Sequence, residues 1–341
     1  MATAGTLESP ISASASASVP GTWRRVLGYL GGAVLGLVLL LAAATKALDP
    51  LAFAEQIQAE GLNGLFSAST VALIGLGIET AVGLALLLGL RRLWVLIPSV
   101  LLVAFLVFLT GRTYVRSIHG EAPAAASCGC FGNLVQRTPA EAFWQDLLLL
   151  VPPLGLAFVG RPRGGRFPGG RVAAVALATG AAVVFGAKAA DLPLDDLATR
   201  LKPGVVTAKV CVGEGKDAIC LDTLVPDLAR EKHMVVLADL DNPAFTGMVP
   251  DLNRYSQGAQ GEAGQNDAGP LVVISATPPT TSFLFTFGPA FKIHDAPPAL
   301  LRPLYRRLPR AFSVRDGKVE RTYSTVQEIR QALGAPVSAR P

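Results

Sequence analysis

The chain has 341 residues, of which 51% are hydrophobic and only 16% are charged, whereas charged residues make up about 25% of an ordinary soluble domain. This composition, with a mean hydropathy of +0.45, excludes a single water-soluble globule and predicts a membrane protein. The 30 basic and 25 acidic residues leave a net charge of only +5, so a nucleic-acid partner is not expected.

The chain begins with a polar tail and a first apolar stretch. Residues 1–22 are rich in Ser and Ala and carry one charge, Glu8, without the basic start of a secretion signal. They predict a disordered tail. Residues 26–45 carry no charge, and at about 1.5 Å per residue a helix of this length crosses about 30 Å of hydrocarbon.

Four further apolar stretches each predict a membrane-spanning helix. The third of them follows Thr138-Pro139-Ala140-Glu141, a helix-start signal in which the Glu side chain reaches back to the cap, but Asp146 and two prolines interrupt it. The sequence therefore predicts a four-helix membrane domain over residues 23–160, then an Arg-rich loop and a fifth, tethering helix over residues 161–192. The four stretches are residues 68–90, 93–111, 142–160 and 172–187.

The basic residues predict the orientation of the spans. Five spans in alternation place three segments on one side, and these hold eight basic residues against four on the other. The positive-inside rule then puts the N-terminus in the cytoplasm and everything after the fifth helix on the outer side of the membrane. The eight are Arg24, Arg25, Arg91, Arg92, Arg161, Arg163, Arg166 and Arg171, and the four are Lys46, Arg112, Arg116 and Arg137.

Two ionisable residues lie within or beside the spans. Glu79 is near the middle of the second span, where a charged side chain costs at least about 2.5–3.5 kcal/mol, so we expect it to face the interior of the bundle. Lys46 ends the first span, and two interpretations stay open. Its amine extends to the membrane surface without a partner, or it forms an ion pair with Glu79.

Cys128 and Cys130 lie in an external loop, separated by a single Gly. Gly permits the unusual backbone angles of a small ring, and a strained, exposed disulfide is readily reduced, so this pair is the candidate redox centre. The alternatives are two unpaired thiols, or a bond to a Cys elsewhere. A metal site is not expected, because His119 is the only histidine near the two thiols.

Four motifs of the membrane half point to one family. They are Lys46-Ala47-Leu48-Asp49-Pro50-Leu51-Ala52-Phe53, Glu79-Thr80-Ala81-Val82-Gly83-Leu84, Cys128-Gly129-Cys130-Phe131-Gly132 and Trp144-Gln145-Asp146. Together they resemble the MauE branch of the DoxX-like membrane proteins, over roughly residues 25–160. The resemblance implies a four-helix integral membrane protein associated with periplasmic thiol–disulfide handling, in a family named for methylamine utilisation. The family extends beyond that pathway, so its substrate does not transfer.

Residues 200–335 have the composition of a soluble α/β domain. Two hairpins are predicted, one around a Gly-containing turn and one around Asp316-Gly317. Apolar runs predict two buried strands between them, and helical spacing predicts one helix before the second strand and one at the end of the domain. The predicted strands are residues 210–212, 219–221, 234–238, 271–275, 311–314 and 319–323, and the helices are residues 246–256 and 325–333.

This order of elements resembles the thioredoxin-like fold of the TlpA kind. Residues 248–253 resemble the helix after the active-site turn, and residues 308–312 resemble the segment with the cis proline, which implies that Pro309 is cis. The sequence departs from the family where its Cys-x-x-Cys belongs. Asn242-Pro243-Ala244-Phe245 stands there without a thiol, which excludes dithiol exchange by the usual centre, while Asp241 or Asn242 can still cap the helix.

Cys211 and Cys220 flank the first hairpin of this domain. A structural disulfide across the two strands is the favoured interpretation, and such a short loop stabilises by about 2–3 kcal/mol. The alternative is that this pair exchanges with Cys128 and Cys130. His119, His233 and His294 are expected to be ordinary surface or capping residues.

The sequence therefore predicts an α-helical membrane bundle of four helices plus a fifth tethering span, followed by an α/β thioredoxin-like domain. Two functions are compatible with it. The first is a redox-associated membrane protein whose loop dithiol, Cys128 and Cys130, exchanges with a periplasmic partner. The second is a non-enzymatic binding or assembly factor with structural cysteines only. No cofactor is evident; a quinone is the usual electron acceptor in such a membrane, but no residue specifies a quinone site.

Overall fold

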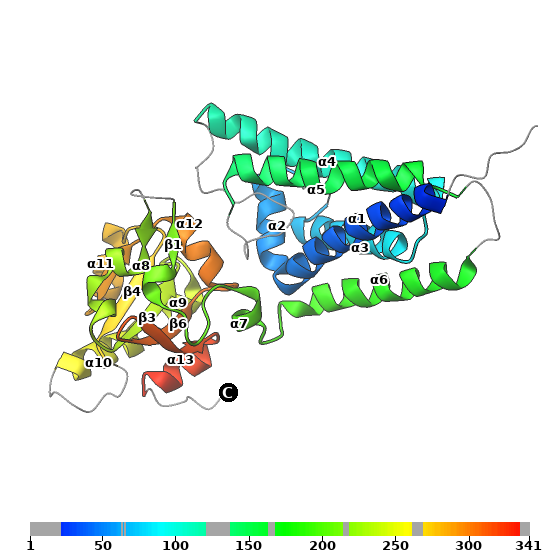
Figure 1. Ribbon diagram of the computed structural model, residues 1–341. Coiled ribbons are helices and arrows are strands. Elements are labelled where there is room, and N and C mark those ends of the chain that lie inside the picture. Colours follow the sequence, from blue (N-terminus) through cyan, green and yellow to red (C-terminus); the bar gives the residue numbers. More distant parts are fainter. Residues whose placement is uncertain are drawn as a thin grey trace, which may run out of the picture.

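The computed structural model describes residues 22–120 apart from 63 and 65, then 137–162, 168–213, 218–260 and 269–334. Within these residues, five helices are long and apolar enough to cross a membrane, and a separate sheet domain follows them (Figure 1). The chain is thus a multi-pass membrane protein. The spans are α1 (Thr22–Leu48), α3 (Ala68–Leu87), α4 (Leu93–Ile118), α5 (Pro139–Val159) and α6 (Gly169–Ala189).

Helix α1 packs closely against both α3 and α5 because glycines line the contacts. A Cβ atom added at Gly36 would lie 2.6 Å from the Gly83 carbonyl oxygen, and one added at Gly28 would lie 2.5 Å from the Gly160 Cα atom. Small residues let membrane helices approach until their backbones touch, which strengthens the dispersion contacts that hold such helices together. The glycines of α1 therefore place it at the centre of the bundle.

The outward faces of the spans are apolar. Leu101 is 67% exposed, Leu148 is 71% exposed and Leu177 is 77% exposed. Such a surface is unfavourable in water, but it matches the hydrocarbon of a bilayer. The lipid bilayer is therefore the solvent of this half of the chain.

The three Arg-bearing segments meet at one end of the bundle. Arg91 donates to the carbonyl oxygens of Arg25 and Gly160, at 3.3 Å and 3.2 Å, and Arg171 donates to the carbonyl of Leu88 at 3.2 Å. The sheet domain lies beyond the opposite end, together with the short helix α2 (Pro50–Ala59) (Figure 1). This is the arrangement that five alternating spans require.

The helices differ most from the predicted ones at two places. Helix α4 continues to Ile118, past the predicted end at residue 111. The predicted end was the end of the uncharged run, whereas the helix itself goes on through Arg112 and Arg116. Helix α2 was not predicted, although Asp49 caps it by accepting a hydrogen bond from the Ala52 N–H at 3.1 Å. Its ten residues are too few for a membrane span, and its apolar residues show no clear helical period.

The sheet domain contains five strands in the order β5-β4-β3-β6-β7. Strands β3, β4 and β5 are parallel, while β6 runs antiparallel to β3 and β7 antiparallel to β6. With helices on both faces (Figure 1), this is the thioredoxin-like arrangement expected from the sequence. The strands are β3 (His233–Ala238), β4 (Leu271–Ser275), β5 (Lys292–Asp295), β6 (Arg310–Arg315) and β7 (Lys318–Tyr323).

The sequence-based prediction missed strand β5 and did not divide the helix after β3. Strand β5 is a half-exposed edge strand with three polar residues of four, so no apolar run signals it. The single helix predicted over residues 246–256 is divided into α9 (Pro243–Thr246) and α10 (Val249–Gln260). Pro250 causes this break, because its ring would clash with the carbonyl of residue 246 in a continuous helix.

The second hairpin and the last helix of the sheet domain begin or turn at the residues that the sequence indicated, and the remaining elements are short. The hairpin of β6 and β7 turns at Asp316 and Gly317, which both have positive φ, as a two-residue turn requires. Thr325 and Glu328 form a capping box before the last helix. The other elements are α7 (Asp195–Ala198), η2 (Thr207–Lys209), β1 (Cys211–Val212), β2 (Ile219–Cys220), α8 (Leu221–Leu224), η4 (Pro226–Ala229), α11 (Thr281–Phe287), α12 (Pro298–Leu301), η5 (Arg302–Leu304) and α13 (Val326–Ala332).

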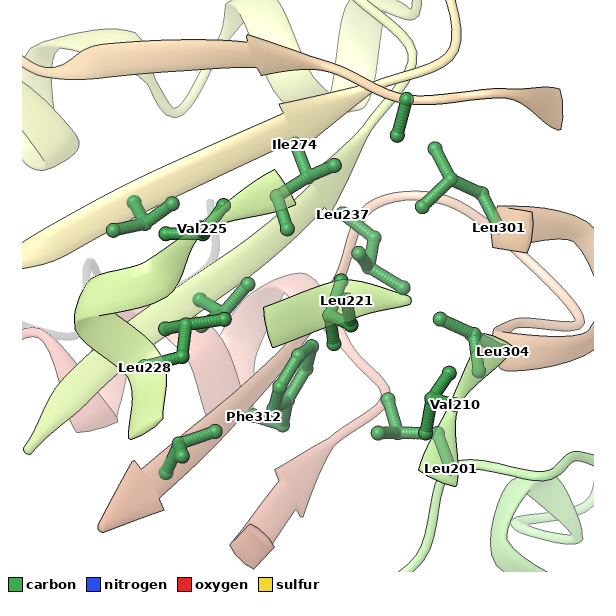
Figure 2. Packing of buried hydrophobic residues seen from close by; sticks show 14 of the residues in the cluster. Leu201, Val210, Leu221, Val225, Leu228, Leu237, Ile274, Leu301, Leu304 and Phe312 are labelled. Carbon is green, nitrogen blue, oxygen red and sulfur yellow. The ribbon is translucent and has the colours of Figure 1, made fainter. Parts of the chain in front are cut away.

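Two apolar cores lie on the two faces of the sheet. Successive side chains of a strand point to opposite faces, so Leu237 enters one core and Val236 enters the other. Figure 2 shows the first core, in which Phe312 of β6 packs among leucines from the short helices. Both faces are covered, which explains why β3 and β4 are continuous apolar runs.

Tyr255 tests the packing of α10 on the sheet. Its hydroxyl donates to the Gly269 carbonyl at 2.6 Å, and burial raises its pKa to about 12. A Tyr255→Phe variant of the detergent-solubilised chain should lose about 1 kcal/mol of unfolding free energy at pH 7. In the parent, the raised pKa means that stability is complete below pH ~10 and falls as the pH rises towards 12.

Alkaline titration checks this prediction. The absorbance of tyrosinate should show a tyrosine that ionises near pH 12 in the parent and is missing from the variant. If the parent instead gained this extra tyrosinate near pH ~10, at the pKa of an ordinary tyrosine, the Tyr255 phenol would be accessible to solvent.

Candidate functional site

The ionisable residues of the second span and of the first helix end meet inside the bundle. Lys46 donates to a carboxylate oxygen of Glu79, and the side chains are only 4% and 3% exposed. The Lys46 amine also lies 4.7 Å from the centre of the Phe53 ring, on α2. Of the two interpretations that stayed open for Lys46, the structure has the ion pair, and Glu79 faces the interior.

This pair fixes three helices relative to one another. Lys46 belongs to α1, Glu79 to α3 and Phe53 to α2, and the cation is attracted by both the carboxylate and the ring face. The second carboxylate oxygen of Glu79 has no hydrogen-bond partner among the described residues. Buried ionisable pairs in a membrane are costly and mark sites with a defined task, so Lys46 and Glu79 remain site candidates.

A second buried ion pair holds the start of α5. Arg137 donates to Asp146 at 3.2 Å, and their side chains are 7% and 2% exposed. In the sequence, Asp146 interrupts a span and belongs to the Trp144-Gln145-Asp146 motif, but no partner for its charge is indicated. Its basic partner lies nine positions earlier in the chain, outside the helix, so helical spacing could not have identified the pair.

Cys128 and Cys130 lie outside the described residues, and the structure reports only on the segments that border their loop. Helix α4 ends at Ile118, and Arg112 near this end forms an ion pair with Glu60, just after α2, at 3.6 Å. The chain resumes at Arg137 before α5. Both borders lie at the end of the bundle that faces the sheet domain (Figure 1).

Cys211 and Cys220 form a disulfide in the sheet domain. They are directly opposite each other in the antiparallel pair of β1 and β2. The bond closes a short hairpin whose neighbours Val210 and Leu221 are buried in the first apolar core. Its position within one supersecondary unit is that of a structural cross-link.

Removal of this disulfide should have a moderate effect on stability. A Cys211→Ser, Cys220→Ser double variant should lose about 2–3 kcal/mol of unfolding free energy, because the denatured chain regains the freedom of a short loop. Equilibrium denaturation of the purified chain, with and without prior reduction of the parent, measures this loss. A reduced parent that is as stable as the oxidised one would contradict a stabilising role.

The position of the missing thiol centre is occupied by Asn242, at the start of α9. Its side-chain oxygen accepts a hydrogen bond from the Ala244 N–H at 2.8 Å, which caps the helix. Its amide group donates to the Leu308 carbonyl at 3.3 Å, and the Leu308–Pro309 peptide bond is cis. The turn and the proline segment are thus adjacent, but no residue of 242–245 can exchange a disulfide.

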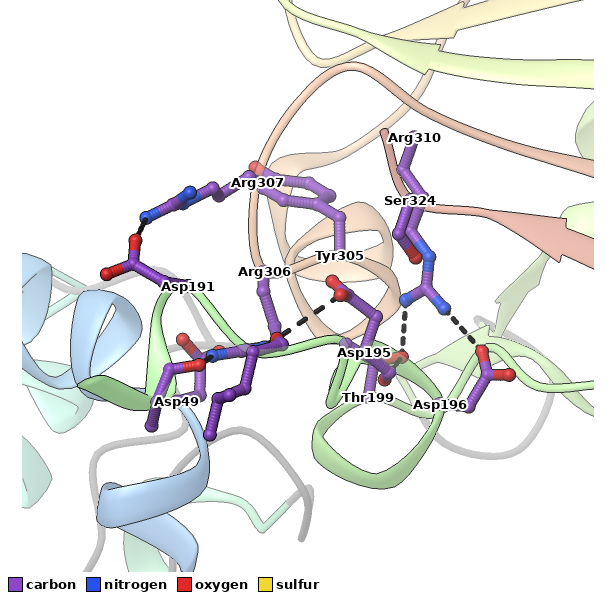
Figure 3. A network of polar contacts seen from close by, with 12 residues as sticks. Asp49, Asp191, Asp195, Asp196, Thr199, Tyr305, Arg306, Arg307, Arg310 and Ser324 are labelled. Carbon is purple, nitrogen blue, oxygen red and sulfur yellow. Dashed lines mark hydrogen bonds and ion pairs between the residues drawn. The ribbon is translucent and has the colours of Figure 1, made fainter. Parts of the chain in front are cut away.

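Arg310, directly after the cis proline, is a polar centre that sequence reasoning missed. It is completely buried and donates to the Thr199 hydroxyl at 2.5 Å, the Asp196 carboxylate at 2.9 Å, and two backbone carbonyls. The carbonyls are those of Leu304 and Leu201, at 2.8 Å and 3.0 Å. Figure 3 shows how this guanidinium joins β6 to the segment around α7.

The histidines do not gather into a metal site. No group of three or more His, Cys, Asp or Glu residues with metal-binding geometry is present within the described part of the chain. His233 corrects an expectation, because it is 4% exposed at the start of β3 and not a surface residue. Both its ring nitrogens lack a hydrogen-bond partner among the residues described.

Comparison with known proteins gives one matching family and several similar solved structures. Residues 24–160 match the family described as "Methylamine utilisation protein MauE". Among solved structures, the chain is similar to a crystal structure of a candidate thiol:disulfide interchange protein DsbE from Chlorobium tepidum. The identity is 16% and the TM-score 0.28, and the match covers 39% of this chain and 99% of that one. None of the curated proteins matches the chain.

Proposed function

We propose that this chain is a membrane protein of thiol–disulfide handling, in which Cys128 and Cys130 exchange with a partner protein outside the cytoplasm. The observation that carries the proposal is spatial. The two segments that border the Cys128–Cys130 loop lie at the end of the bundle that faces a thioredoxin-like domain (Figure 1). Residues 24–160 match a family named for methylamine utilisation, and the proposed role, which the resemblance to that family implies, is the maturation of a partner protein.

The proposed reaction is an ordinary disulfide exchange. A thiolate of the partner attacks one sulfur of the Cys128–Cys130 disulfide, whose S–S bond breaks, and the other sulfur leaves as a thiolate. The second thiolate of the partner then attacks the mixed disulfide. The partner ends as a disulfide, and Cys128 and Cys130 end as a dithiol. A membrane quinone takes up the two electrons and two protons when the dithiol is oxidised again.

We further propose the orientation. The end of the bundle with Arg25, Arg91 and Arg171 faces the cytoplasm of a bacterial inner membrane, because positively charged segments are retained there. The sheet domain and the loop with Cys128 and Cys130 then lie in the periplasm, where thiols are oxidised. A reporter fused after Pro341 tests this directly: a periplasm-specific reporter should be active, and activity of a cytoplasm-specific one alone would refute the orientation.

The reduction potential of the Cys128–Cys130 pair tests the reaction. The purified chain in nanodiscs is equilibrated with glutathione buffers, and alkylated peptides are counted by mass spectrometry. An exchanging pair should have a potential between about −120 and −230 mV, whereas structural disulfides lie below about −300 mV. The Cys211–Cys220 bond is an internal control that should stay oxidised throughout. A Cys128–Cys130 potential as low as that of the control would contradict exchange.

A second candidate function is a binding or assembly factor without redox activity. The observation in its favour is the absence of any thiol in residues 242–245, where the thioredoxin-like domain would carry its centre. A Cys130→Ser variant discriminates between the two functions. An exchanging loop should accumulate a mixed disulfide with a partner through Cys128, and a Cys128→Ser, Cys130→Ser variant should not. Full maturation activity of that double variant would favour the assembly factor.

A further inference from the structure

The sheet domain contacts the membrane half through three arginines that precede the cis proline: Arg302, Arg306 and Arg307, here called the basic segment. Arg302 lies 2.7 Å from the carboxylate of Glu55, on α2. Arg307 lies 3.5 Å from the carboxylate of Asp191, directly after α6. The partners belong to two different parts of the membrane half, and each contact joins opposite charges.

Arg306 makes the most buried of these contacts. Its side chain is 3% exposed, and it donates to the carbonyl oxygens of Ala189 at 2.5 Å and Leu192 at 3.1 Å. These carbonyls belong to the last residue of α6 and to the turn after it, where the helix dipole favours a positive charge. The Asp195 carboxylate lies 3.8 Å away, as Figure 3 shows. A residue of the sheet domain thus caps the last span.

Asp49 is a buried acidic residue of the membrane half that interacts with the basic segment. It is 8% exposed at the start of α2. Burial raises its pKa, while the Ala52 N–H and the charges of Arg302 and Arg306 act in the opposite direction. The charges of Arg302 and Arg306 thus favour the ionised form of Asp49. A buried carboxylate between the two halves needs this compensation.

The contacts extend to the position of the missing thiol centre. The Arg302 guanidinium lies 5.1 Å from the centre of the Tyr305 ring. Leu308, next to Arg307, accepts the hydrogen bond from Asn242. The face with the former centre is therefore continuous with the face that contacts α2 and the end of α6.

We propose that the basic segment is a docking surface whose partner is this chain's own membrane half. The contact with α2 and the end of α6 lies beside the turn of residues 242–245, whose Pro243 and Ala244 stay exposed. The domain is held in one orientation and is not a free tether. This inference rests on the contacts of the described residues and holds whether or not Cys128 and Cys130 exchange.

Hydrogen exchange of the full chain in nanodiscs, followed by mass spectrometry, tests the docking. Arg306→Met should raise the exchange of residues 189–199 at least tenfold, since it removes the buried cation that the carbonyls of Ala189 and Leu192 and the Asp195 carboxylate contact. Arg302→Glu should raise the exchange of residues 50–59 several-fold, because it places two acids in contact. The matched control is Arg254→Glu, which reverses a charge at a side chain that is 65% exposed on α10.

Reversing both charges of the pair separates docking from damage to the fold. Arg302→Glu combined with Glu55→Arg forms an opposite-charge pair again, so the hydrogen-exchange rate of residues 50–59 should return to within about twofold of that of the parent. The docking surface would be disproved if the hydrogen-exchange rates of Arg306→Met and Arg302→Glu both equalled those of the Arg254→Glu control. It would also be disproved if the double variant exchanged as fast as Arg302→Glu alone.

Discussion

A Glu79→Gln variant should lose about 3–5 kcal/mol of unfolding free energy, because the Lys46 ammonium stays charged without its counter-ion. Both side chains are inside the bundle, with 4% and 3% exposure, so water cannot replace the lost carboxylate. The remaining attraction to the Phe53 ring, at 4.7 Å, offsets at most about 2 kcal/mol. Equilibrium unfolding in mixed micelles, followed by tryptophan fluorescence, measures the loss.

The double variant Lys46→Met, Glu79→Gln provides the matched comparison. It removes both charges and keeps the volume of the side chains, so it should be more stable than Glu79→Gln alone by about 2 kcal/mol or more. Glu231→Gln, at an exposed position of the sheet domain, should change the stability by less than about 0.5 kcal/mol. A Glu79→Gln chain as stable as this control would mean that the Lys46 charge has another buried partner.

An Arg310→Met variant should lose about 3–5 kcal/mol, because four acceptors, three of them buried, lose the guanidinium at once. The guanidinium is completely buried, and it joins Thr199 and Asp196 to β6. Arg310→Lys should recover little of the loss, since an ammonium group cannot reproduce the planar fork that reaches several acceptors. The effect should be confined to the sheet domain, whose cores lie on either side of β6.

Two controls make this prediction specific. Arg315→Met removes an arginine that is 53% exposed on the same strand, and it should cost less than about 1 kcal/mol. Thermal unfolding by circular dichroism then separates the two variants, because the strand signal of Arg310→Met should disappear first. If Arg310→Met and Arg315→Met unfolded at the same temperature, the buried guanidinium would not be holding β6 to the segment of α7.

The spans and the main strands were predictable from the sequence because their signals are local. A span needs only a continuous apolar length, and all five appear near the predicted positions. The start of α5 is a reciprocal cap between Thr138 and Glu141, three residues apart. The turn at Asp316 and Gly317 is likewise set by two adjacent residues. Elements such as α2 and β5 were missed because they lack a strong local signal.

The candidate site was only partly predictable. The lack of a thiol at Asn242–Phe245 is a fact of the sequence, and the disulfide of Cys211 and Cys220 follows from a hairpin that the sequence indicated. Asp146 was read as an obstacle to a span, yet it is an ion-pair partner of Arg137. A burial cost is visible in a sequence, but the group that compensates it is not.

By itself, the sequence determined which segments cross the bilayer, which form the sheet, and that the thioredoxin-like centre has no thiols. Only the tertiary structure decided which charges meet. Lys46 and Glu79 are 33 positions apart, and Arg306 caps a carbonyl 117 positions before it. Local apolar patterns specify helices and strands because each residue's environment repeats with the element's period. Contacts between elements depend on how those elements pack, and no local period encodes that.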